Sequence, residues 1–300
     1  MVEKRKFWHW AVLAALSLIW GSSYILMKKG LQSFTPYQIG SIRILITSVC
    51  LLPVALKNMH RLNRNNIISV LIIGYAGNAI PAFLYPAAQT HISSSLTGML
   101  NTLSPVFTLL LGIMIYRRKA INSQITGVFL GLAGAAGLLY SGSFSINWFG
   151  LFVVAATMLN GLSNNEVSRT RGLNGIRITA LAFFLSLPLA IAYLPFSHIG
   201  TALHSQGAVR NLGYITILSV VGSAIAQGLY YMLIRDTSPV FASVVTYFIP
   251  VVSTMWGVLD GEALSASMAS VIFILAGVFF INRPDFLLRK KKAEVPVNVP

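Results

Sequence analysis

The sequence predicts an all-α polytopic membrane protein, with ten transmembrane helices that form two five-helix repeats of inverted topology around a central cavity. The first observation is composition: 55% of the 300 residues are hydrophobic and only 10% are charged, against roughly 25% charged residues in an ordinary soluble domain. The second observation is that continuous apolar runs of membrane-spanning length recur along the whole chain. The third is an internal repeat.

The repeat aligns residues 77–112 with residues 222–257 at a constant offset of 145 and without a gap. Nine of the 36 aligned positions are identical, namely Gly77/Gly222, Ala79/Ala224, Ile80/Ile225, Leu84/Leu229, Tyr85/Tyr230, Ser93/Ser238, Pro105/Pro250, Val106/Val251 and Gly112/Gly257. After a two-residue slip the match resumes at residues 132–134 and 275–277. Such a repeat is a recurrent basis of alternating access in secondary transporters.

The first half is predicted to hold five spans. Residues 8–27 follow a basic start and look like a signal sequence, but the apolar run is long and no small-residue cleavage site follows it, so we expect an uncleaved helix. Residues 36–57 form the second span. The third and fourth spans, residues 67–90 and 92–115, carry regularly spaced polar side chains. The fifth, residues 124–140, has a glycine surface suited to close helix packing.

The second half is predicted to repeat this order with five more spans. They cover residues 148–168, 177–195, 212–233, 240–259 and 265–282. Because each half holds an odd number of spans, the second half enters the membrane from the opposite side to the first. The pseudo-two-fold axis that relates the halves then lies in the membrane plane.

Two domains follow from this count. The first five-helix repeat is predicted to cover residues 1–142 and the second residues 147–290, joined by a link that contains Gly and Ser at residues 141–145. Residues 291–300 are predicted to form a basic, flexible cytoplasmic tail. Loops are short except near residues 196–211, which leaves no room for a soluble catalytic domain, and no phosphate-binding Walker loop is present.

Lys and Arg residues are distributed unevenly between the two sides of the predicted helices. The side that holds both termini carries 18 of them, the other side carries three, and Arg43 lies within a span, which accounts for all 22. This asymmetry follows the positive-inside rule, so both termini are predicted to be cytoplasmic. The net charge of +15 is therefore a topology signal. No nucleic acid is expected as a partner, because no basic face interleaved with aromatic residues lies outside the membrane.

Polar side chains follow helical spacing in several spans, which predicts a lined cavity. In the third span Asn78 and Tyr85 share one face, and in the eighth span Gln227 and Tyr231 share another. These faces converge if the helices form a bundle. The predicted substrate-binding residues are the amides, hydroxyls and aromatic rings on such faces: Trp20, Tyr24, Asn78, Tyr85, Asn101, Asn160, Asn164, Gln227, Tyr231, Thr246 and Tyr247.

A second interpretation is open for these residues. Ser and Thr hydroxyls commonly bond to their own helix backbone, and a single aromatic ring commonly packs in a core. Four amides, those of Asn101, Asn160, Asn164 and Gln227, either face the cavity or link neighbouring helices. An amide has four hydrogen-bonding sites, which its own helix backbone cannot satisfy.

Pro105 and Pro250 occupy equivalent positions in the fourth and ninth spans. A proline inside a helix removes the bond to the carbonyl four residues earlier and kinks the axis. The freed carbonyls would belong to Asn101 and Thr246. Two interpretations are open: a binding point for a substrate ammonium or hydroxyl group, or a hinge or fixed bend without ligand contact.

Charged residues inside the spans are few. Arg43 lies about 10 Å into the second span by helix rise, where it clamps the neighbouring chain, extends outward or meets an anionic substrate group. Glu166 lies near the cytoplasmic end of the sixth span and Glu262 beyond the outer end of the ninth, and both are candidates for a structural or coupling role. No Asp, Glu or His lies at a span midplane, so proton coupling is not supported. Cys50 is the only cysteine, and no metal, cofactor or catalytic group is expected.

Two sets of motifs lie close to the aligned segments, one before the first segment and one at the end of the second. The first half carries the run Trp20-Gly21-Ser22-Ser23-Tyr24, Lys28 or Lys29, Pro36 and Arg43. The second half carries Pro250 followed by Gly261-Glu262, where the first half has Tyr116-Arg117 instead. In this order, and with ten spans and a repeat, the motifs resemble the drug/metabolite transporter superfamily and within it the ten-helix EamA-type exporters.

The resemblance implies a central cavity lined by helices 1, 3, 4, 6, 8 and 9, with helices 5 and 10 as scaffold. It also implies export of small metabolites, often amino acids, across a bacterial inner (plasma) membrane. We therefore predict a multi-pass secondary transporter, not driven by ATP and not an enzyme, that exports small amphipathic metabolites, amino acids first among them, by alternating access. The expected partners are a small-molecule substrate and the lipid bilayer, with a monomer or weak homodimer as the oligomeric state.

Three alternatives stand beside this prediction. A drug or nucleobase carrier of the same superfamily is the first. Sugar nucleotides are disfavoured, because their phosphates would need several basic cavity residues and only Arg43 is available. Of a different class are an integral-membrane enzyme that acts on lipid and a membrane scaffold that transports nothing.

Overall fold

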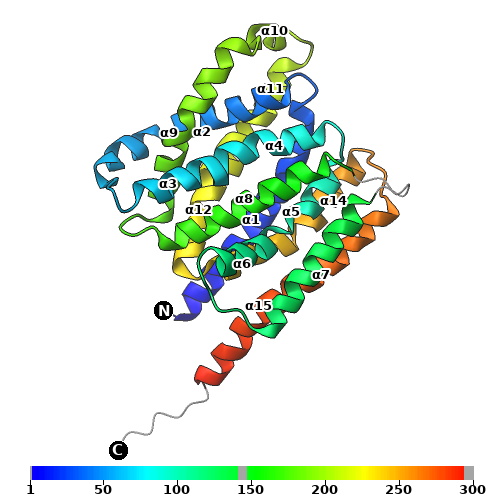
Figure 1. Ribbon diagram of the computed structural model, residues 1–300. Coiled ribbons are helices and arrows are strands. Elements are labelled where there is room, and N and C mark those ends of the chain that lie inside the picture. The colour runs from blue at the N-terminus through cyan, green and yellow to red at the C-terminus, as the bar shows by residue number, and fades with distance from the viewer. Residues whose placement is uncertain (1, 141–146, 294–300) are drawn as a thin grey trace, which may run out of the picture.

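The computed structural model describes the backbone of residues 2–140 and 147–293 and, Val240 apart, the side chains of residues 7–140 and 147–282 (Figure 1). The predicted link at residues 141–145 and the last seven residues of the predicted tail lie outside the described residues. Every element in the described part of the chain is a helix.

The first half of the chain forms α1 (Val2–Gly30), α2 (Pro36–Asn58), α3 (Ile67–Gly74), η2 (Tyr75–Ala79), α4 (Ile80–Gln89), α5 (Ser94–Asn101), α6 (Ser104–Met114) and α7 (Asn122–Leu139). The second half forms α8 (Gly150–Arg169), α9 (Gly175–Tyr193), α10 (Ile199–Leu203), α11 (Ala208–Ile217), η4 (Leu218–Ile225), α12 (Ala226–Asp236), α13 (Pro239–Ala242), η5 (Ser243–Tyr247), α14 (Ile249–Leu259), η6 (Ala266–Ser270) and α15 (Val271–Ala293).

Within the described residues, seven helical segments are long and apolar enough to cross a membrane. They are Phe7–Gly30, Pro36–Arg61, Ile67–Gln89, Ser94–Met114, Asn122–Leu139, Gly175–Phe196 and Ala208–Asp236. Two shorter apolar segments, Ser243–Leu259 and Ala266–Asn282, match the predicted ninth and tenth spans. The predicted sixth span is α8, which is rich in asparagine and is not among the seven. The described part of the chain is thus all-helical with several apolar spans, which confirms the predicted class in this coarse form.

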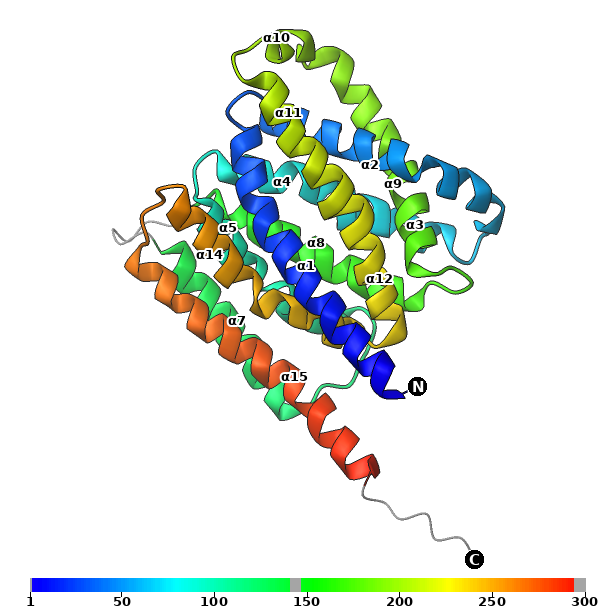
Figure 2. The same cartoon turned by 180° about the vertical axis from the view of Figure 1, so that it is seen from behind.

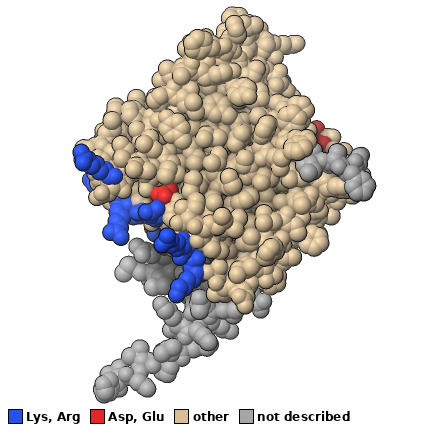
Figure 3. All heavy atoms as spheres, in the orientation of Figure 1, with Lys and Arg blue, Asp and Glu red and all other residues tan. Residues whose placement is uncertain are grey.

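The outer surface is largely apolar. Phe129, Phe196 and Val209 are each 70% exposed or more, which suits contact with lipid chains and would favour aggregation in water. On the face drawn in Figure 3 the Lys and Arg side chains gather along one edge, and most of the remaining surface is uncharged.

Two apolar segments are interrupted by π-helical turns at corresponding positions of the two halves. η2 separates α3 from α4, and η4 separates α11 from α12. Within these turns the Asn78 side-chain amide donates to the Ile73 carbonyl (2.8 Å), and the Ser223 hydroxyl donates to the Leu218 carbonyl (3.4 Å). Both bonds reach five residues back, and the two pairs are related by the offset of 145. Single π turns of this kind often occur at functional sites.

The identical serines at 93 and 238 have the same local role. The Ser93 hydroxyl accepts from the Leu96 backbone N–H at 3.1 Å, and the Ser238 hydroxyl accepts from the Phe241 N–H at 3.0 Å. Each serine therefore caps the first turn of a helix, α5 or α13.

The two prolines of the repeat begin helices instead of bending them. Pro105 is the second residue of α6, and Pro250 is the second residue of α14. A proline in the first turn loses no helical hydrogen bond, because the N–H groups there have no partner within the helix. The predicted kinks are therefore breaks in the helix, one after α5 and one after η5.

Helices α7 and α15 lie side by side at the edge of the molecule (Figures 1 and 2). Their glycines let the two backbones touch, as the fifth-span glycine surface predicted. A Cβ atom added at Gly277 would lie 2.5 Å from the Gly127 carbonyl oxygen and 2.7 Å from the Gly131 nitrogen. Only hydrogen fits there.

Gly277→Ala is expected to lower the apparent melting temperature of the detergent-purified protein by several degrees. The new methyl group meets backbone atoms that cannot rotate away, and such overpacking costs about 1–3 kcal/mol. Gly200→Ala in α10 is the matched control, because a Cβ there meets nothing within 4 Å. Equal melting temperatures for the two variants would contradict the tight α7–α15 contact.

Candidate functional site

A cavity of about 90 Å³ lies between the helices, with room for several water molecules. Its walls come from α1, α2, the third and fourth predicted spans, α8, α12 and η5. Among the residues with described side chains, none of those that line the cavity comes from α7 or α15. The lining is rich in amides and tyrosines, so the cavity offers both hydrogen bonds and aromatic surface.

The structure brings ten of the eleven predicted substrate-binding residues together at this cavity. They are Trp20, Tyr24, Asn78, Tyr85, Asn101, Asn160, Asn164, Gln227, Tyr231 and Thr246. The eleventh, Tyr247, is not a lining residue and interacts with Asn282 of α15. Both Thr246 and Tyr247 belong to the 3-10 helix η5, in which consecutive side chains point about 120° apart. Their role in binding stays a prediction.

Several lining residues were not among the predicted ones. Tyr230 is the most instructive, because it is identical to Tyr85 in the repeat and so carried a signal in the sequence. Ser163 gave no such signal. Its place follows from a close helix approach, since a side chain at Gly77 would collide with the Ser163 hydroxyl group.

Tyr85 connects three helices across one wall of the cavity. The Asn160 side-chain amide of α8 donates to the Tyr85 hydroxyl at 3.0 Å, and that hydroxyl donates to the side-chain Oδ1 atom of Asn101 at 2.6 Å. The ring of Tyr24 in α1 packs edge-on against the Tyr85 ring, with centroids 6.0 Å apart. This wall therefore holds a chain of polar groups beside aromatic surface.

Other lining residues also combine polar groups with aromatic rings. The hydroxyls of Ser163 and Tyr231 lie 3.2 Å apart, and the Trp20 indole donates to the Gly222 carbonyl at 3.0 Å. The Asn164 amide donates to the Thr108 hydroxyl of α6 at 3.3 Å while it also lines the cavity. For Asn160 and Asn164 the two open interpretations therefore both hold, because each amide links helices and faces the cavity.

Arg43 extends into the protein and lines the cavity. Its Nε atom donates to the Ser223 hydroxyl of η4 at 2.7 Å. Of the three predicted placements, extension outward is therefore wrong. The clamp between α2 and η4 is present, and the guanidinium group also faces the cavity.

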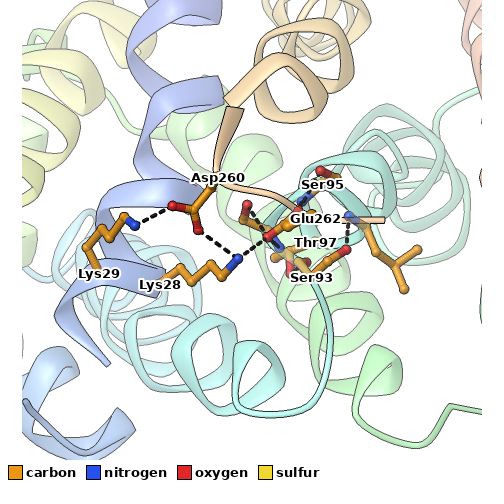
Figure 4. A network of polar contacts seen from close by, with 9 residues as sticks. Lys28, Lys29, Ser93, Ser95, Thr97, Asp260 and Glu262 are labelled. Atoms are coloured by element: carbon orange, nitrogen blue, oxygen red, sulfur yellow. Dashed lines mark hydrogen bonds and ion pairs between the residues drawn. The ribbon is translucent and has the colours of Figure 1, made fainter. Parts of the chain in front are cut away.

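The Glu262 network, made of Lys28, Lys29, Asp260, Glu262 and the serines that bind them, joins three helices away from the cavity (Figure 4). Lys28 lies 2.9 Å from both the Asp260 and the Glu262 carboxylates, and Lys29 pairs with Asp260. Lys28 stands at the end of α1 opposite to the N-terminus.

The Glu262 carboxylate caps the first turn of α5. One oxygen accepts from the N–H and hydroxyl of Ser94, each at 2.8 Å, and the other accepts from the N–H at 3.0 Å and the hydroxyl at 2.7 Å of Ser95. Burial alone would raise the pKa of Glu262, but Lys28 and these donors lower it to about 2. Glu262 is therefore charged at physiological pH.

Glu166 organises a second network, which also lies apart from the cavity lining. Its carboxylate accepts from the Ser69 hydroxyl at 2.6 Å, the Tyr116 hydroxyl at 2.5 Å and Arg169 at 3.2 Å. Burial and the neighbouring carboxylate raise the pKa of Tyr116 well above its usual value. The phenol therefore stays protonated and ties the end of α6 to α8.

The turns after α6 and α14 share a backbone feature that refines the repeat. Arg117 has a φ of 52° and Gly261 a φ of 80°, and these are left-handed values at corresponding turns. The residue that follows the left-handed one is Arg118 in the first half and Glu262 in the second, so the backbone geometry pairs Arg118 with Glu262. The constant offset of 145 pairs Arg117 with Glu262 instead. Arg118 donates to Ser168 of α8 at 3.0 Å, so a basic residue occupies this position in the first half.

The chain is similar over nearly its whole length to known transporters. A model of the EamA-like transporter family matches twice, at residues 7–140 and 147–283. The protein named uncharacterized inner membrane transporter YedA of Escherichia coli strain K12 is 27% identical over 293 residues, which cover 95% of this chain and 94% of that protein.

The chain is also similar to a transporter with a named substrate and to a protein of known structure. The S-adenosylmethionine/S-adenosylhomocysteine transporter of Chlamydia muridarum is 21% identical over 286 residues, which cover 90% of each chain. A protein of known crystal structure is similar in fold, with a TM-score of 0.63, 16% identity, and coverage of 94% of this chain and 98% of that one.

Proposed function

The chain belongs to the EamA-like transporter family, and we propose that it is a secondary carrier that exports small amphipathic metabolites across a bacterial inner membrane by alternating access. It is a multi-pass membrane transporter, and its relative YedA is named as an inner membrane transporter. The observation that carries the finer proposal is the cavity, in which amides and tyrosines from both halves surround one space. A small molecule and the bilayer are its proposed partners, and a monomer or weak homodimer its proposed state.

The proposed mechanism is a rocking of two inverted five-helix halves about the cavity. Three local features support the repeat: the π turns with their five-residue side-chain bonds, the serine caps, and the prolines at the start of α6 and α14. The separate match of the family model to each half supports it too. The Glu262 and Glu166 networks would close the two ends in turn.

The proposed orientation places both termini in the cytoplasm. It is supported by the 18 Lys and Arg residues on that side of the predicted spans against three on the other. The Lys and Arg side chains that gather along one edge of the molecule in Figure 3 fit the same orientation.

Amino acids are the first proposed substrates. Amide groups suit an ammonium or carboxylate group, and tyrosine rings suit an apolar side chain. A metabolite that carries a nucleoside is the second candidate, because one relative is named as a carrier of S-adenosylmethionine. The cavity volume of about 90 Å³ favours the smaller class, since pockets for drug-sized ligands measure roughly 300–1,000 Å³.

Purified protein reconstituted into liposomes is expected to move labelled amino acids down their gradient and to exchange them for internal amino acids. The measurement is uptake into vesicles preloaded with unlabelled solute, with empty liposomes as the control. A panel of the twenty amino acids, nucleobases and S-adenosylmethionine covers both substrate candidates. If folded protein moves no member under any imposed gradient, the proposed function is wrong.

A further inference from the structure

Among the residues that the structure describes, Arg43 is the one lining residue of the cavity that carries a formal charge. The other lining side chains, all within the described residues, are neutral amides, hydroxyls, aromatic rings and small apolar groups. The guanidinium group has five N–H donors. The structure gives it one side-chain acceptor, the Ser223 hydroxyl on Nε, so the four N–H groups of the two Nη atoms have no protein acceptor among the described side chains.

The carboxylates among the described side chains, which could neutralise Arg43, are engaged elsewhere. Glu166 is bound in its own network, and Asp260 and Glu262 bind the lysines of α1. Asp236 lies 4.0 Å from His9. Within the part of the chain whose side chains are described, these are the four acidic residues, and none is a salt-bridge partner of Arg43.

An unpaired cation inside a membrane protein is costly, and such residues usually face a cavity where they meet a charged ligand. The planar guanidinium fork matches a carboxylate through two parallel hydrogen bonds. Ser223 holds Nε, and Ser223 is itself held by the Leu218 carbonyl of the π turn. The fork is therefore fixed in direction before any ligand arrives.

We propose that the carrier recognises a carboxylate group of its substrate through the Nη atoms of Arg43, with Ser223 as the positioning residue. This inference rests on the proposed transport function and names the chemical group that the cavity selects. Tyr24 and Tyr85 line the same cavity and form the wall against which the rest of the substrate would pack. Substrates are therefore free or zwitterionic carboxylic acids, and cationic amines without a carboxylate are rejected.

The test compares each of the twenty amino acids with its carboxamide, which differ only in the carboxylate. Binding is measured as ligand-induced thermal stabilisation in detergent, and transport as uptake into liposomes. Wild-type protein is expected to bind and move at least one acid and to prefer it at least tenfold over its amide. Arg43→Gln is expected to lose that preference, and Ser223→Ala to weaken acid binding by several fold.

Two controls separate a binding role from a purely structural clamp. Arg210→Gln removes an exposed positive charge outside the cavity and is expected to leave the preference unchanged. Arg43→Lys keeps the charge without the fork, so it should retain part of the acid preference. A clamp alone would lower the melting temperature of unliganded Arg43→Gln and leave its ratio of acid to amide binding unchanged.

Different outcomes would overturn the carboxylate inference and the proposed transport function. If solutes move but acids and amides move equally well, or if Arg43→Gln keeps the wild-type preference, the carboxylate inference is overturned and transport stands. If no solute of either kind binds or moves while the protein remains folded, both are overturned.

Discussion

Glu262→Gln is expected to lower the apparent melting temperature by roughly 6–12 °C, which corresponds to about 3 kcal/mol. The carboxylate accepts four hydrogen bonds from Ser94 and Ser95 and pairs with Lys28. A glutamine side chain has only one acceptor oxygen, so its NH2 group would face the Ser95 or Ser94 donors. The measurement is thermal unfolding of the purified protein in detergent.

A charge exchange tests whether the network is only an ion pair. In Lys28→Glu/Glu262→Lys the two charges are swapped, but a lysine at 262 would face the N–H groups and positive end of α5. We expect no recovery of stability relative to Glu262→Gln. Recovery to the wild-type melting temperature would show that the ion pair alone matters and that the helix cap does not.

The pH dependence of this difference has a definite sign. Because the pKa of Glu262 falls from its usual value of 4.5 to about 2 in the folded protein, its stabilisation is fully present above about pH 4.5 and declines as the pH falls toward 2. The gap in melting temperature between wild type and Glu262→Gln should therefore be constant from about pH 5 to 8 and shrink below about pH 4.5. A gap that changes between pH 6 and 8 would mean that another group titrates with this network.

Tyr85→Phe is expected to reduce transport at low substrate concentration by about 10- to 100-fold. Removal of the hydroxyl leaves the side-chain Oδ1 atom of Asn101 and the side-chain NH2 group of Asn160 without their shared partner, and each unpaired buried polar group costs about 1–3 kcal/mol. The two amides would then turn toward each other or toward water and lose their arrangement around the cavity. Initial uptake rates into liposomes at several concentrations measure the change.

Tyr37→Phe is the matched control for this variant. The Tyr37 ring is 55% exposed and is not a lining residue of the cavity, so loss of its hydroxyl should leave transport unchanged. Wild-type rates for Tyr85→Phe would show that the cavity between Tyr24 and Tyr85 is not on the path of the substrate.

The sequence predicted which side chains surround the cavity better than it predicted their partners. Asn101, Asn160 and Gln227 stood out because polar groups inside an apolar span must find a partner away from lipid. Their helical spacing then indicated which face of each span lines the cavity. That Asn160 meets Tyr85, 75 residues away, depends on how the helices pack.

Local departures from the α-helix account for two of the differences between the predicted and the observed positions. Tyr247 was predicted on the cavity face, but the 3-10 helix η5 rotates it toward α15. The prolines were predicted inside continuous helices, yet Pro105 and Pro250 begin new ones. Tyr230 was missed because its neighbour Tyr231 was predicted to share a helix face with Gln227, although both tyrosines line the cavity.

By itself the sequence determined the class of protein and the internal repeat, since composition, apolar run length and internal identity need no knowledge of packing. Its motifs also carried the resemblance to the family, because short runs of residues can be compared without a structure. Only the tertiary structure decided that Lys28 meets Glu262, that Glu262 caps α5, and that Arg43 turns inward to Ser223. These contacts join residues 167 to 234 positions apart. Such pairs depend on the relative rotation and depth of whole helices, and the periodicity of one helix carries no information about them.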